Sequence, residues 1–366
     1  MKYLLTILIM SLTLSIKAQM DSPPLKVAVI GLTHTHVHWI LGREDRGDIE
    51  IVAVVESNQD LAERYMKQHG MSMDLVYPTM QGMIQSVKPE AVTAFGTIYD
   101  HLEVVEFFAP KGIHVMVEKP LAVSLDHAKK MQALAKKHKI HLLTNYETTW
   151  YASNTMAYEM TQSGDLGELR KIVVHDGHPG PKEIGVNEEF LEWLIDPKWN
   201  GAGALTDFGC YGANLSTWLL NGKRPQTVFA MTATNKPDIY PLVDDEATIL
   251  LQYPKTQVII QASWNWPVSR KDMQVYGVKG QASADNGGTL RYQLGDDADE
   301  ITINDLSLEG PESDPFAYLN AVVKGEIKPK PTDLSALENN MIVMEILDAA
   351  MKSAKSGKAI ELNKGQ

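Results

Sequence analysis

A lysine at the end of an apolar run is the residue of this sequence best suited to proton chemistry. Lys119 follows the run Ile113–Val117 and Glu118, and Pro120 comes directly after it. Such a run is typical of a buried strand, and a side chain at the carboxyl end of a parallel strand points into the ligand crevice. Burial lowers the pKa of a lysine and prepares it to exchange a proton with a hydroxyl group. We therefore expect Lys119 to be catalytic, with Glu118 orienting it or contacting a cofactor.

A second group of chemically useful residues falls on one predicted helix, Leu205–Leu220. Asp207, Tyr211 and Asn214 follow one another at spacings of four and three positions, so they share one face of this helix. A carboxylate, a phenol and an amide on one face can bind a polar ligand and move a proton. The alternative is that Tyr211 is an aromatic residue packed in the core.

The turn after the first predicted strand has the features of a dinucleotide site. The run Leu25–Ile30 is followed by Gly31-Leu-Thr-His-Thr-His36. Backbone N–H groups and the positive end of the following helix hold a pyrophosphate at such a turn. Only Gly31 keeps glycine, because Thr33 and His36 stand at the other two small positions of the motif. Glu56, at the end of the second predicted strand, can bind both ribose hydroxyls and would repel a 2′-phosphate, which favours NAD over NADP.

The histidines of this turn also raise the alternative of a metal site. His34 and His38 are four positions apart and could share a helix face. No cysteine, aspartate or glutamate lies beside them at ligand spacing. Histidine N–H groups close to a phosphate, or a purely structural role, are simpler explanations. We therefore expect no metal, and we assign His34 and His36 to cofactor binding.

Strand and helix patterns alternate through the first half of the chain. After the strands Leu25–Ile30 and Ile49–Val55, apolar segments recur around Leu75, at 91–95, at 113–117 and at 141–144. Helical periodicity separates them, most clearly over 59–69, 101–108 and 124–139. This alternation predicts an α/β domain over residues 20–146, with a parallel sheet wound on both sides as in a Rossmann fold.

The second half has a different pattern. Helices are predicted at 151–162, 205–220 and 333–355, and strands at 171–175, 227–232, 247–253, 257–263 and 273–276. Grouped strands of this kind predict an α+β domain over residues 147–366 with a large, open, mainly antiparallel sheet. An open sheet needs cover on one face, so we expect a homo-oligomer, a dimer or a tetramer, formed through it.

Charge and the first residues limit the partners and the compartment. The chain has 46 acidic and 34 basic residues in 366, a net charge of −12, which argues against binding to nucleic acid. Lys2, an apolar run to about Ile16 and the small residue Ala18 predict a cleavable signal peptide over residues 1–18, with export to the periplasm and no membrane attachment afterwards. A membrane anchor is the alternative, but the run is shorter than a spanning helix needs.

Five stretches taken together resemble one family. They are Val117-Glu-Lys-Pro-Leu121, the strand-ending Glu56, Gly96-Thr-Ile-Tyr-Asp-His101, Gly164-Asp-Leu-Gly-Glu-Leu169 and Gly201-Ala-Gly-Ala-Leu-Thr-Asp-Phe-Gly-Cys-Tyr211. In this order and spacing the chain resembles the Gfo/Idh/MocA family of oxidoreductases, and within it the glucose–fructose oxidoreductase branch. The resemblance implies a Rossmann domain followed by an α/β domain with a large open sheet.

The resemblance also implies roles for residues. Thr97 and His101 join Gly31, Thr33, His34, His36, Glu56, Glu118 and Lys119 as cofactor contacts. Family members carry aspartate and histidine where this chain has Asp207 and Tyr211, and both serve the reacting hydroxyl. We expect Asp207 to fix substrate hydroxyls and Tyr211 to be the acid/base group, its pKa lowered by Lys119. For a carbohydrate substrate, Asn214, His175 and His178 are the candidate ligands.

The expected activity is hydride transfer to or from a hydroxyl-bearing carbon of a sugar or polyol, with NAD as the cofactor and NADP less favoured. An exported chain without a twin-arginine signal crosses the membrane unfolded and cannot carry NAD with it. Either the cofactor is scavenged and held tightly, which we expect, or the site has lost NAD, with which the altered glycine motif is compatible. Two alternatives remain open at this point. One is a glycoside hydrolase or lyase that uses bound NAD without net redox, and the other is a non-catalytic sugar-binding protein.

Overall fold

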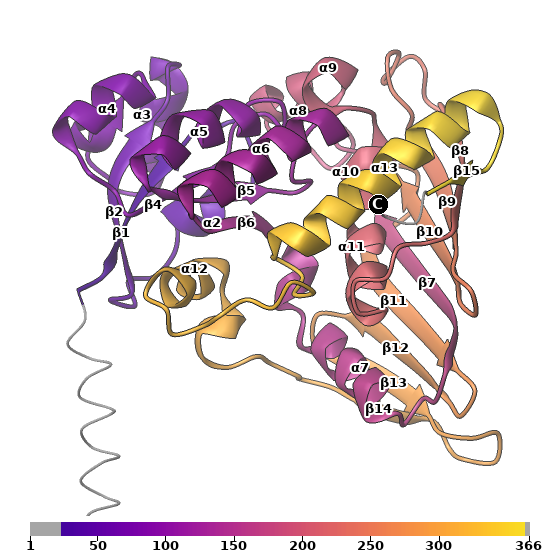
Figure 1. Ribbon diagram of the computed structural model, residues 1–366. Coiled ribbons are helices and arrows are strands. Elements are labelled where there is room, and N and C mark those ends of the chain that lie inside the picture. Colours follow the sequence, from indigo (N-terminus) through magenta and orange to yellow (C-terminus); the bar gives the residue numbers. More distant parts are fainter. Residues whose placement is uncertain (1–22, 363–366) are drawn as a thin grey trace, which may run out of the picture.

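The computed structural model describes residues 23–362, so the predicted signal peptide over residues 1–18 lies outside the described part of the chain. Two sheets organise these residues (Figure 1). Between residues 23 and 362 no helix has the length and apolar content needed to cross a bilayer.

The first sheet has six parallel strands in the order β3-β2-β1-β4-β5-β6. The strands are β1 (Leu25–Ile30), β2 (Ile49–Val55), β3 (Val76–Tyr77), β4 (Ala91–Ala94), β5 (His114–Glu118) and β6 (Leu142–Asn145). The connecting helices are α2 (Val37–Leu41), α3 (Gln59–Gln68), α4 (Met80–Ser86), α5 (His101–Phe108) and α6 (Leu125–His138). The strand order with its reversal beside β1 is that of a Rossmann fold, as predicted.

Local sequence signals set where these helices start. The side chains of Asn58, Thr79 and Ser124 each accept a hydrogen bond from a backbone N–H in the first turn of α3, α4 and α6. The strands are buried on both faces, since α4, α5 and α6 pack against one face and α2 and α3 against the other.

A C-terminal helix completes the core of this first domain. In α12 (Pro315–Val323), the side chains of Phe316, Leu319 and Val322 join a core cluster with Leu25 and Val27 of β1. The nearby side chain of Arg43 donates a 3.0 Å hydrogen bond to Asp314, the N-cap of α12. The predicted division at residue 147 separates the two sheets, but the segment assigned to the second domain therefore returns to the first.

The second sheet has nine strands in the order β14-β13-β12-β11-β7-β10-β9-β8-β15. They are β7 (Leu169–Gly177), β8 (Thr227–Ala233), β9 (Glu246–Gln252), β10 (Gln257–Ser263), β11 (Arg270–Gly277), β12 (Gln281–Asn286), β13 (Thr289–Gln293), β14 (Ile301–Ile303) and β15 (Ile360–Glu361). The pair β7–β10 is parallel and the other neighbours are antiparallel, which confirms the predicted open, mainly antiparallel sheet.

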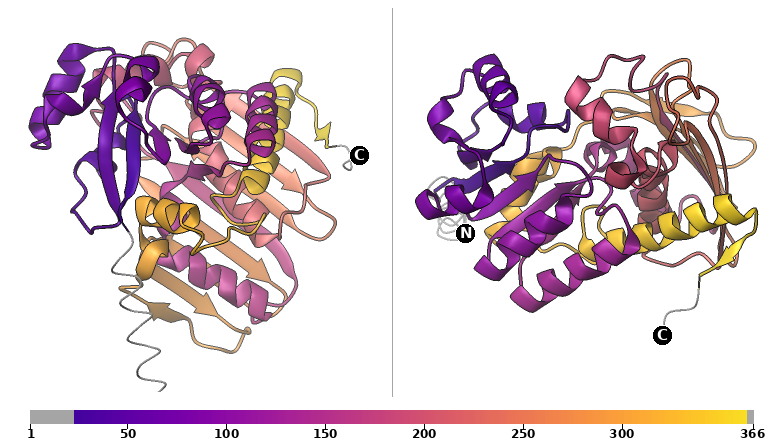
Figure 2. Two further views of the ribbon diagram at one scale, coloured as in Figure 1. Left: turned by 60° about the vertical axis from the view of Figure 1, so that its left-hand side comes forward. Right: turned by 90° about the horizontal axis from the view of Figure 1, so that it is seen from above.

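Helices cover one face of the second sheet, as Figure 2 shows from two further directions. They are α10 (Ala204–Asp207), α11 (Gly209–Leu219) and α13 (Leu337–Ser356), with α7 (Ala152–Ser163) at the β12–β13 end. The long α13 also packs against α6 of the first domain, so it connects the two units. Two short helices, α8 (Glu188–Leu194) and α9 (Pro197–Asn200), lie in the long connection after β7.

Candidate active site

The end of β5 meets the helical layer of the second domain at one ion pair. The ammonium group of Lys119 donates to the carboxylate of Asp207 and, at 3.2 Å, to the backbone carbonyl of the same residue. The indole Nε1 of Trp264 donates to the other carboxylate oxygen of Asp207 at 3.0 Å. Lys119 and Asp207 are only 5% and 4% exposed. A charged pair that is buried and fully bonded in this way fixes the ammonium group at the junction of the two domains.

The ion pair reverses the pKa shift expected for Lys119. Burial acts to lower the pKa of this lysine, but the nearby carboxylate of Asp207 outweighs it, and the pKa is raised. Burial similarly acts to raise the pKa of Asp207, and Lys119 outweighs it, so that pKa is lowered. Lys119 is therefore an ammonium group and Asp207 a carboxylate at neutral pH, and the expectation that burial lowers the pKa of Lys119 below its usual value is wrong.

Tyr211 lies beside this pair, although not on the predicted helix. The helix expected over Leu205–Leu220 is broken at Phe208, so Asp207 ends α10 and Tyr211 lies in the first turn of α11. The ring centroid of Tyr211 is 5.4 Å from the ammonium nitrogen of Lys119. Burial, followed by the charge of Glu147, raises the pKa of Tyr211 well above its usual value. The expectation that Lys119 lowers this pKa is therefore wrong, and the phenol stays protonated.

A second cation near Tyr211 was not found from the sequence. The ammonium nitrogen of Lys271, on β11, lies 5.2 Å from the ring centroid of Tyr211 and forms an ion pair with Glu147. The hydroxyl of Tyr151 donates to the other oxygen of Glu147 at 2.6 Å. The ring of Tyr211 therefore lies near two ammonium groups, and each of these groups forms an ion pair with a carboxylate.

Two of the three predicted substrate ligands lie elsewhere. The amide of Asn214 donates at 2.9 Å to the carbonyl of Leu334 and is buried against α13. His175 is on the sheet face away from the helices, where its Nδ1 lies 2.9 Å from a carboxylate oxygen of Asp272. The next residue of β7, Asp176, points to the helices instead, because successive side chains of a strand alternate.

His178 does lie at the site. Its pKa is lowered to about 4, mainly by burial, and the charges of Asp207 and Lys119 also act on it. Nδ1 accepts the backbone N–H of Gly180 at 3.0 Å, so the neutral ring carries its proton on Nε2. His178 is therefore a hydrogen-bond donor at neutral pH.

A cavity of about 490 Å³ lies at the carboxyl ends of β1, β2 and β4. Its lining includes five predicted cofactor residues, Gly31, Thr33, Glu56, Thr97 and His101. Glu56 accepts the backbone N–H groups of Leu32 at 3.0 Å and of Asn58 at 2.8 Å, and so ties the glycine turn to the end of β2. Gly31 has a φ of +78°, and a Cβ atom there would lie 2.7 Å from the backbone nitrogen of Gly96.

The turn after Gly31 offers polar atoms that no described residue satisfies. The hydroxyl oxygens of Thr33 and Thr35 and the Nε2 of His34 are buried without a partner among residues 23–362. Nδ1 of His34 accepts the backbone N–H of His36 at 3.1 Å, so Nε2 carries the proton of the neutral ring. Buried polar groups in proteins are normally paired. Three hydroxyl and N–H donors at the end of β1 fit the oxygens of a dinucleotide pyrophosphate, even though two glycines of the usual motif are missing.

His36 and Glu118 connect this turn to Lys119. Nδ1 of His36 lies 2.9 Å from a carboxylate oxygen of Glu118, and the amide of Asn145 donates to the other oxygen at 2.7 Å. Burial raises the pKa of Glu118, and burial lowers the pKa of His36 and of His34. Glu118 thus orients the turn, and it precedes Lys119 at the end of β5 as predicted.

The folded chain corrects one part of the metal argument. Glu118, distant in sequence, brings a carboxylate to His34 and His36, and one possible ligand atom from each of the three lies within 4.8 Å of the others. His38 is not one of these three residues, because its Nδ1 contacts Nε2 of His69 at 2.8 Å. His34 and His38 do not share a helix face, because His34 precedes the first residue of α2. The expectation of no metal stays a prediction.

Models of two domains of one family match the chain. The model described as the oxidoreductase family with an NAD-binding Rossmann fold matches residues 25–146, and the model of the GFO/IDH/MocA C-terminal domain matches residues 155–283. The chain belongs to the Gfo/Idh/MocA family of oxidoreductases.

Several relatives match over nearly the whole of this Gfo/Idh/MocA chain. The D-glucoside 3-dehydrogenase of Escherichia coli (strain K12) is 23% identical, over 94% of this chain and 100% of that protein. The structure of aldose-aldose oxidoreductase from Caulobacter crescentus, complexed with glycerol, matches with a TM-score of 0.76 and 22% identity, over 93% of this chain and 100% of the other. An inositol dehydrogenase homolog from Azotobacter vinelandii, complexed with NAD+, matches with a TM-score of 0.78 and 17% identity, over 93% and 98%. At such identities the solved structures establish the fold.

In this Gfo/Idh/MocA protein the connection after β7 covers the phosphate turn. The rings of Phe190 and Trp193, in and at the end of α8, lie 4.8 and 5.8 Å from the ring of His34. Glu189 forms an ion pair with Arg64 of α3 in the first domain. We call the connection over residues 178–202 the covering segment. It contacts the first domain at His34 and Arg64.

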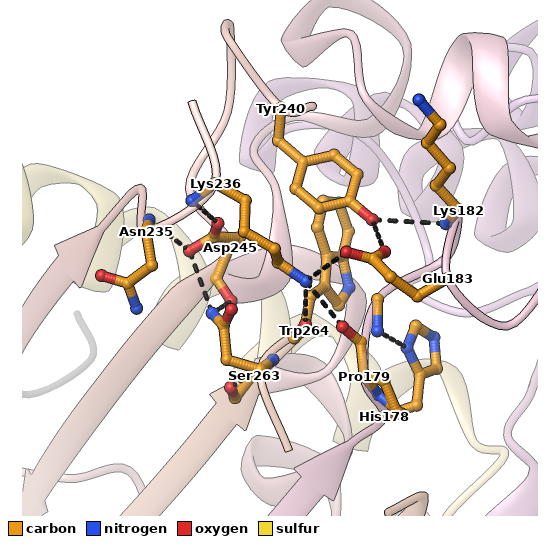
Figure 3. A network of polar contacts seen from close by, with 12 residues as sticks. His178, Pro179, Lys182, Glu183, Asn235, Lys236, Tyr240, Asp245, Ser263 and Trp264 are labelled. Carbon is orange, nitrogen blue, oxygen red and sulfur yellow. Dashed lines mark hydrogen bonds and ion pairs between the residues drawn. The ribbon is translucent and has the colours of Figure 1, made fainter. Parts of the chain in front are cut away.

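A polar network attaches the start of the covering segment to the second sheet (Figure 3). The ammonium group of Lys236 donates to the carbonyls of Pro179 and Trp264, at 2.6 and 2.7 Å, and to the carboxylate of Glu183 at 2.7 Å. Trp264 in turn bonds Asp207, and Pro179 follows His178. Lys236 therefore holds the backbone at Pro179, next to His178, and the backbone of Trp264, whose indole group bonds Asp207 of the Lys119–Asp207 ion pair.

Proposed function

We propose that this protein is an NAD-dependent oxidoreductase that transfers a hydride to or from a hydroxyl-bearing carbon of a sugar or polyol. The observation that carries the proposal is the buried Lys119–Asp207 pair, which lies where the dinucleotide-binding domain meets the second domain. The names of the D-glucoside 3-dehydrogenase, the aldose-aldose oxidoreductase and the inositol dehydrogenase homolog support a carbohydrate or polyol as the substrate class.

NAD, when bound, supplies the hydride donor or acceptor. Lys119 handles the proton of the substrate oxygen. In the reduction of a carbonyl group its ammonium group donates a proton to the oxygen, and in the oxidation of an alcohol the neutral amine takes that proton. Asp207 holds the ammonium group in place, and the protonated phenol of Tyr211 and the Nε2–H of His178 are hydrogen-bond donors for the same substrate.

Glu56 supports NAD over NADP. Its carboxylate lines the cavity and is only 8% exposed. A 2′-phosphate at this point would meet a negative charge, whereas ribose hydroxyls can donate to it. The remainder of the cofactor site would be formed by Gly31, Thr33, His34, His36, Thr97, His101 and Glu118.

Tight retention of the cofactor is supported by the covering segment. Phe190, Trp193 and the Arg64–Glu189 ion pair close the region above the phosphate turn, so release of a dinucleotide requires these contacts to separate. Retention suits an exported protein, and it suits reactions that return the cofactor to its starting state, such as coupled oxidation and reduction of two sugars.

A homo-oligomer is supported by the uncovered face of the second sheet. An apolar row crosses four neighbouring strands on the face that lacks helices. It consists of Val173 on β7, Ile259 on β10, Leu250 on β9 and Phe229 on β8, which are all only partly buried. An apolar row of this kind is typical of an interface. Light scattering coupled to size-exclusion chromatography would measure the mass of the dimer or tetramer that we propose.

The experiment that tests the proposed function measures the bound cofactor. The purified chain is denatured, and the released supernatant is assayed for NAD(H) and NADP(H) by mass spectrometry. We expect close to one NAD(H) per chain and turnover of a glucoside, an aldose or inositol that depends on Lys119. The absence of bound NAD(H), together with no binding of added NAD, would overturn the proposal in favour of a non-catalytic sugar-binding protein.

A further inference from the structure

Asp176 is a buried carboxyl group beside the reaction site that has no partner. The residue is 0% exposed, and neither of its carboxylate oxygens makes a hydrogen bond within residues 23–362. Buried carboxyl groups are rare unless they are paired. The two cations whose charges act on it are already engaged, Lys271 by Glu147 and Lys119 by Asp207.

The register of the sheet shows where the side chain of Asp176 points. On β7, Ile172, Val174 and Asp176 alternate with partly exposed residues and face the helical layer. Asp176 pairs with Lys271 of β11 and with Ala262 of β10, so these side chains share its face. Lys271 reaches Tyr211, and the charge of Lys119 also acts on Asp176, so the carboxyl group belongs to the same site.

The small side chain of Ala262 beside Asp176 leaves the carboxyl group without a polar neighbour on that strand. Burial raises the pKa of Asp176 well above its usual value, and Lys271 only partly opposes this. A neutral carboxyl group both donates and accepts a hydrogen bond, as a sugar hydroxyl does.

The neighbouring carboxylate of Asp207 is already engaged by protein groups. Both oxygens of Asp207 have partners, Lys119 on one and Trp264 on the other. Both oxygens of Asp176 are without partners. The contact with substrate hydroxyls that the sequence assigned to Asp207 is therefore better placed at Asp176.

We propose that Asp176 is a substrate-binding residue that holds a hydroxyl group of the sugar or polyol through its two carboxyl oxygens. This inference rests on the proposed function and names the group that recognises its substrate. Lys119, Asp207 and Asp176 are all buried, so binding of a substrate requires groups that cover them to move.

The test compares sugar binding by the wild type and by Asp176→Leu, which is similar in size and cannot hydrogen-bond. The ligands are methyl β-D-glucopyranoside and its monodeoxy analogues, measured by calorimetry on the NAD-loaded protein. In the wild type we expect one deoxy analogue to bind about tenfold more weakly than the parent, because one hydrogen bond is lost. In Asp176→Leu the parent should bind about as weakly as that analogue does, and the ratio between the two should fall close to one.

Stability separates this role from a structural one. Removal of an unpaired buried carboxyl group should leave the Tm of Asp176→Leu equal to or above that of the wild type. The matched control is Asp285→Asn on β12, which changes the carboxylate that pairs with Arg291 of β13. This variant should keep the wild-type ratio between the affinities for the parent sugar and for the deoxy analogue. If Asp176→Leu does not fold, Asp176→Ala is measured in the same way.

The outcomes are distinct. An unchanged ratio for every deoxy analogue in the variant would overturn the role of Asp176 while leaving the proposed function intact. A wild type that holds NAD but binds none of these sugars, aldoses or inositol would overturn the proposed substrate class, and this inference with it.

Discussion

The two ends of the cleft between the domains bury polar groups in opposite ways. At the phosphate turn, Thr33, His34 and Thr35 have buried donors without partners among the described residues. At the reaction end, Lys119 and Asp207 neutralise each other, and Lys271 and Glu147 form a second pair. The first region is complete only when a ligand supplies acceptor oxygens, whereas in the second the charged groups other than Asp176 already have partners among the described residues. Cofactor binding should therefore stabilise the fold more than substrate binding does.

The largest effect should come from breaking the reaction-end pair. Lys119→Met removes the group that exchanges the proton, and we expect kcat/KM to fall by about 10²- to 10⁴-fold. The content of bound NAD should fall far less than the activity, since Lys119 is only one of the expected cofactor contacts and the phosphate turn and Glu56 are untouched. Steady-state kinetics and mass spectrometry of the released cofactor measure the two quantities.

The surface residue Lys130, on α6, provides the matched control. Lys130→Met should leave both quantities unchanged. Retention of most of the activity by Lys119→Met would show that the buried pair is structural.

The next effect should appear at the cofactor end. Glu56→Ser removes the carboxylate proposed to bind the ribose hydroxyls, and we expect NAD to bind about 10- to 100-fold more weakly, as for lost hydrogen bonds to a charged group. The preference for NAD over NADP should shrink, because the negative charge is gone. Equilibrium binding of both cofactors to the stripped protein gives the ratio, and an unchanged ratio would count against Glu56 as the selecting residue.

The pH dependence distinguishes the two directions of the reaction. The pKa of Lys119 is raised, so the ammonium form persists up to and beyond the usual lysine pKa of about 10.4. Alcohol oxidation needs the neutral amine, so its rate should rise by up to about tenfold per pH unit at pH values below the pKa of Lys119. Carbonyl reduction needs the ammonium group and should stay level over the same range. Rate profiles between pH 6 and 9 in both directions check this, and a level profile for oxidation would contradict the assignment of the proton to Lys119.

The smallest effect should follow from loosening the network of Figure 3. Lys236→Met leaves the carbonyls of Pro179 and Trp264 and the carboxylate of Glu183 without their donor, and we expect a loss of about 1–3 kcal/mol in the free energy of unfolding. Because Trp264 bonds Asp207, kcat should fall more than KM rises. Denaturant unfolding and kinetics provide both measurements.

Lys182 offers a control in the same segment. Its side chain extends away from the network in Figure 3, and it takes part only through its backbone N–H. Lys182→Met should leave stability and kcat unchanged. An equal effect of the two substitutions would show that the network does not position the site.

The sequence predicted the parts of the molecule that depend on local pattern. Short stretches of residues were enough to predict the alternating strands and helices, the turn at Gly31 and the place of Lys119 at the end of a strand. The open sheet of the second domain followed from its grouped strands in the same way, and the resemblance placed Asp207 and Tyr211 at the reaction site.

The rest of the site depends on contacts between distant strands and helices. His175 was predicted as a ligand and Asp176 was not, although a one-residue step along β7 reverses the face on which a side chain lies. The helix predicted over Leu205–Leu220 is two helices that meet at Phe208, and this break was not predicted from the sequence. Lys271, Glu147 and Trp264 come from three separate segments, and only the fold brings them to Tyr211 and Asp207.

Helix α12 has a consequence for how this chain reaches its final form. The apolar surface of Leu25 and Val27 is completed by Phe316, Leu319 and Val322, which are synthesised nearly three hundred residues later. A fragment that ends at residue 146 would contain every strand of the parallel sheet and still leave that surface open to water. Both domains must therefore be present before the first one is whole, and the unit of folding, and of any useful truncation, is the entire chain.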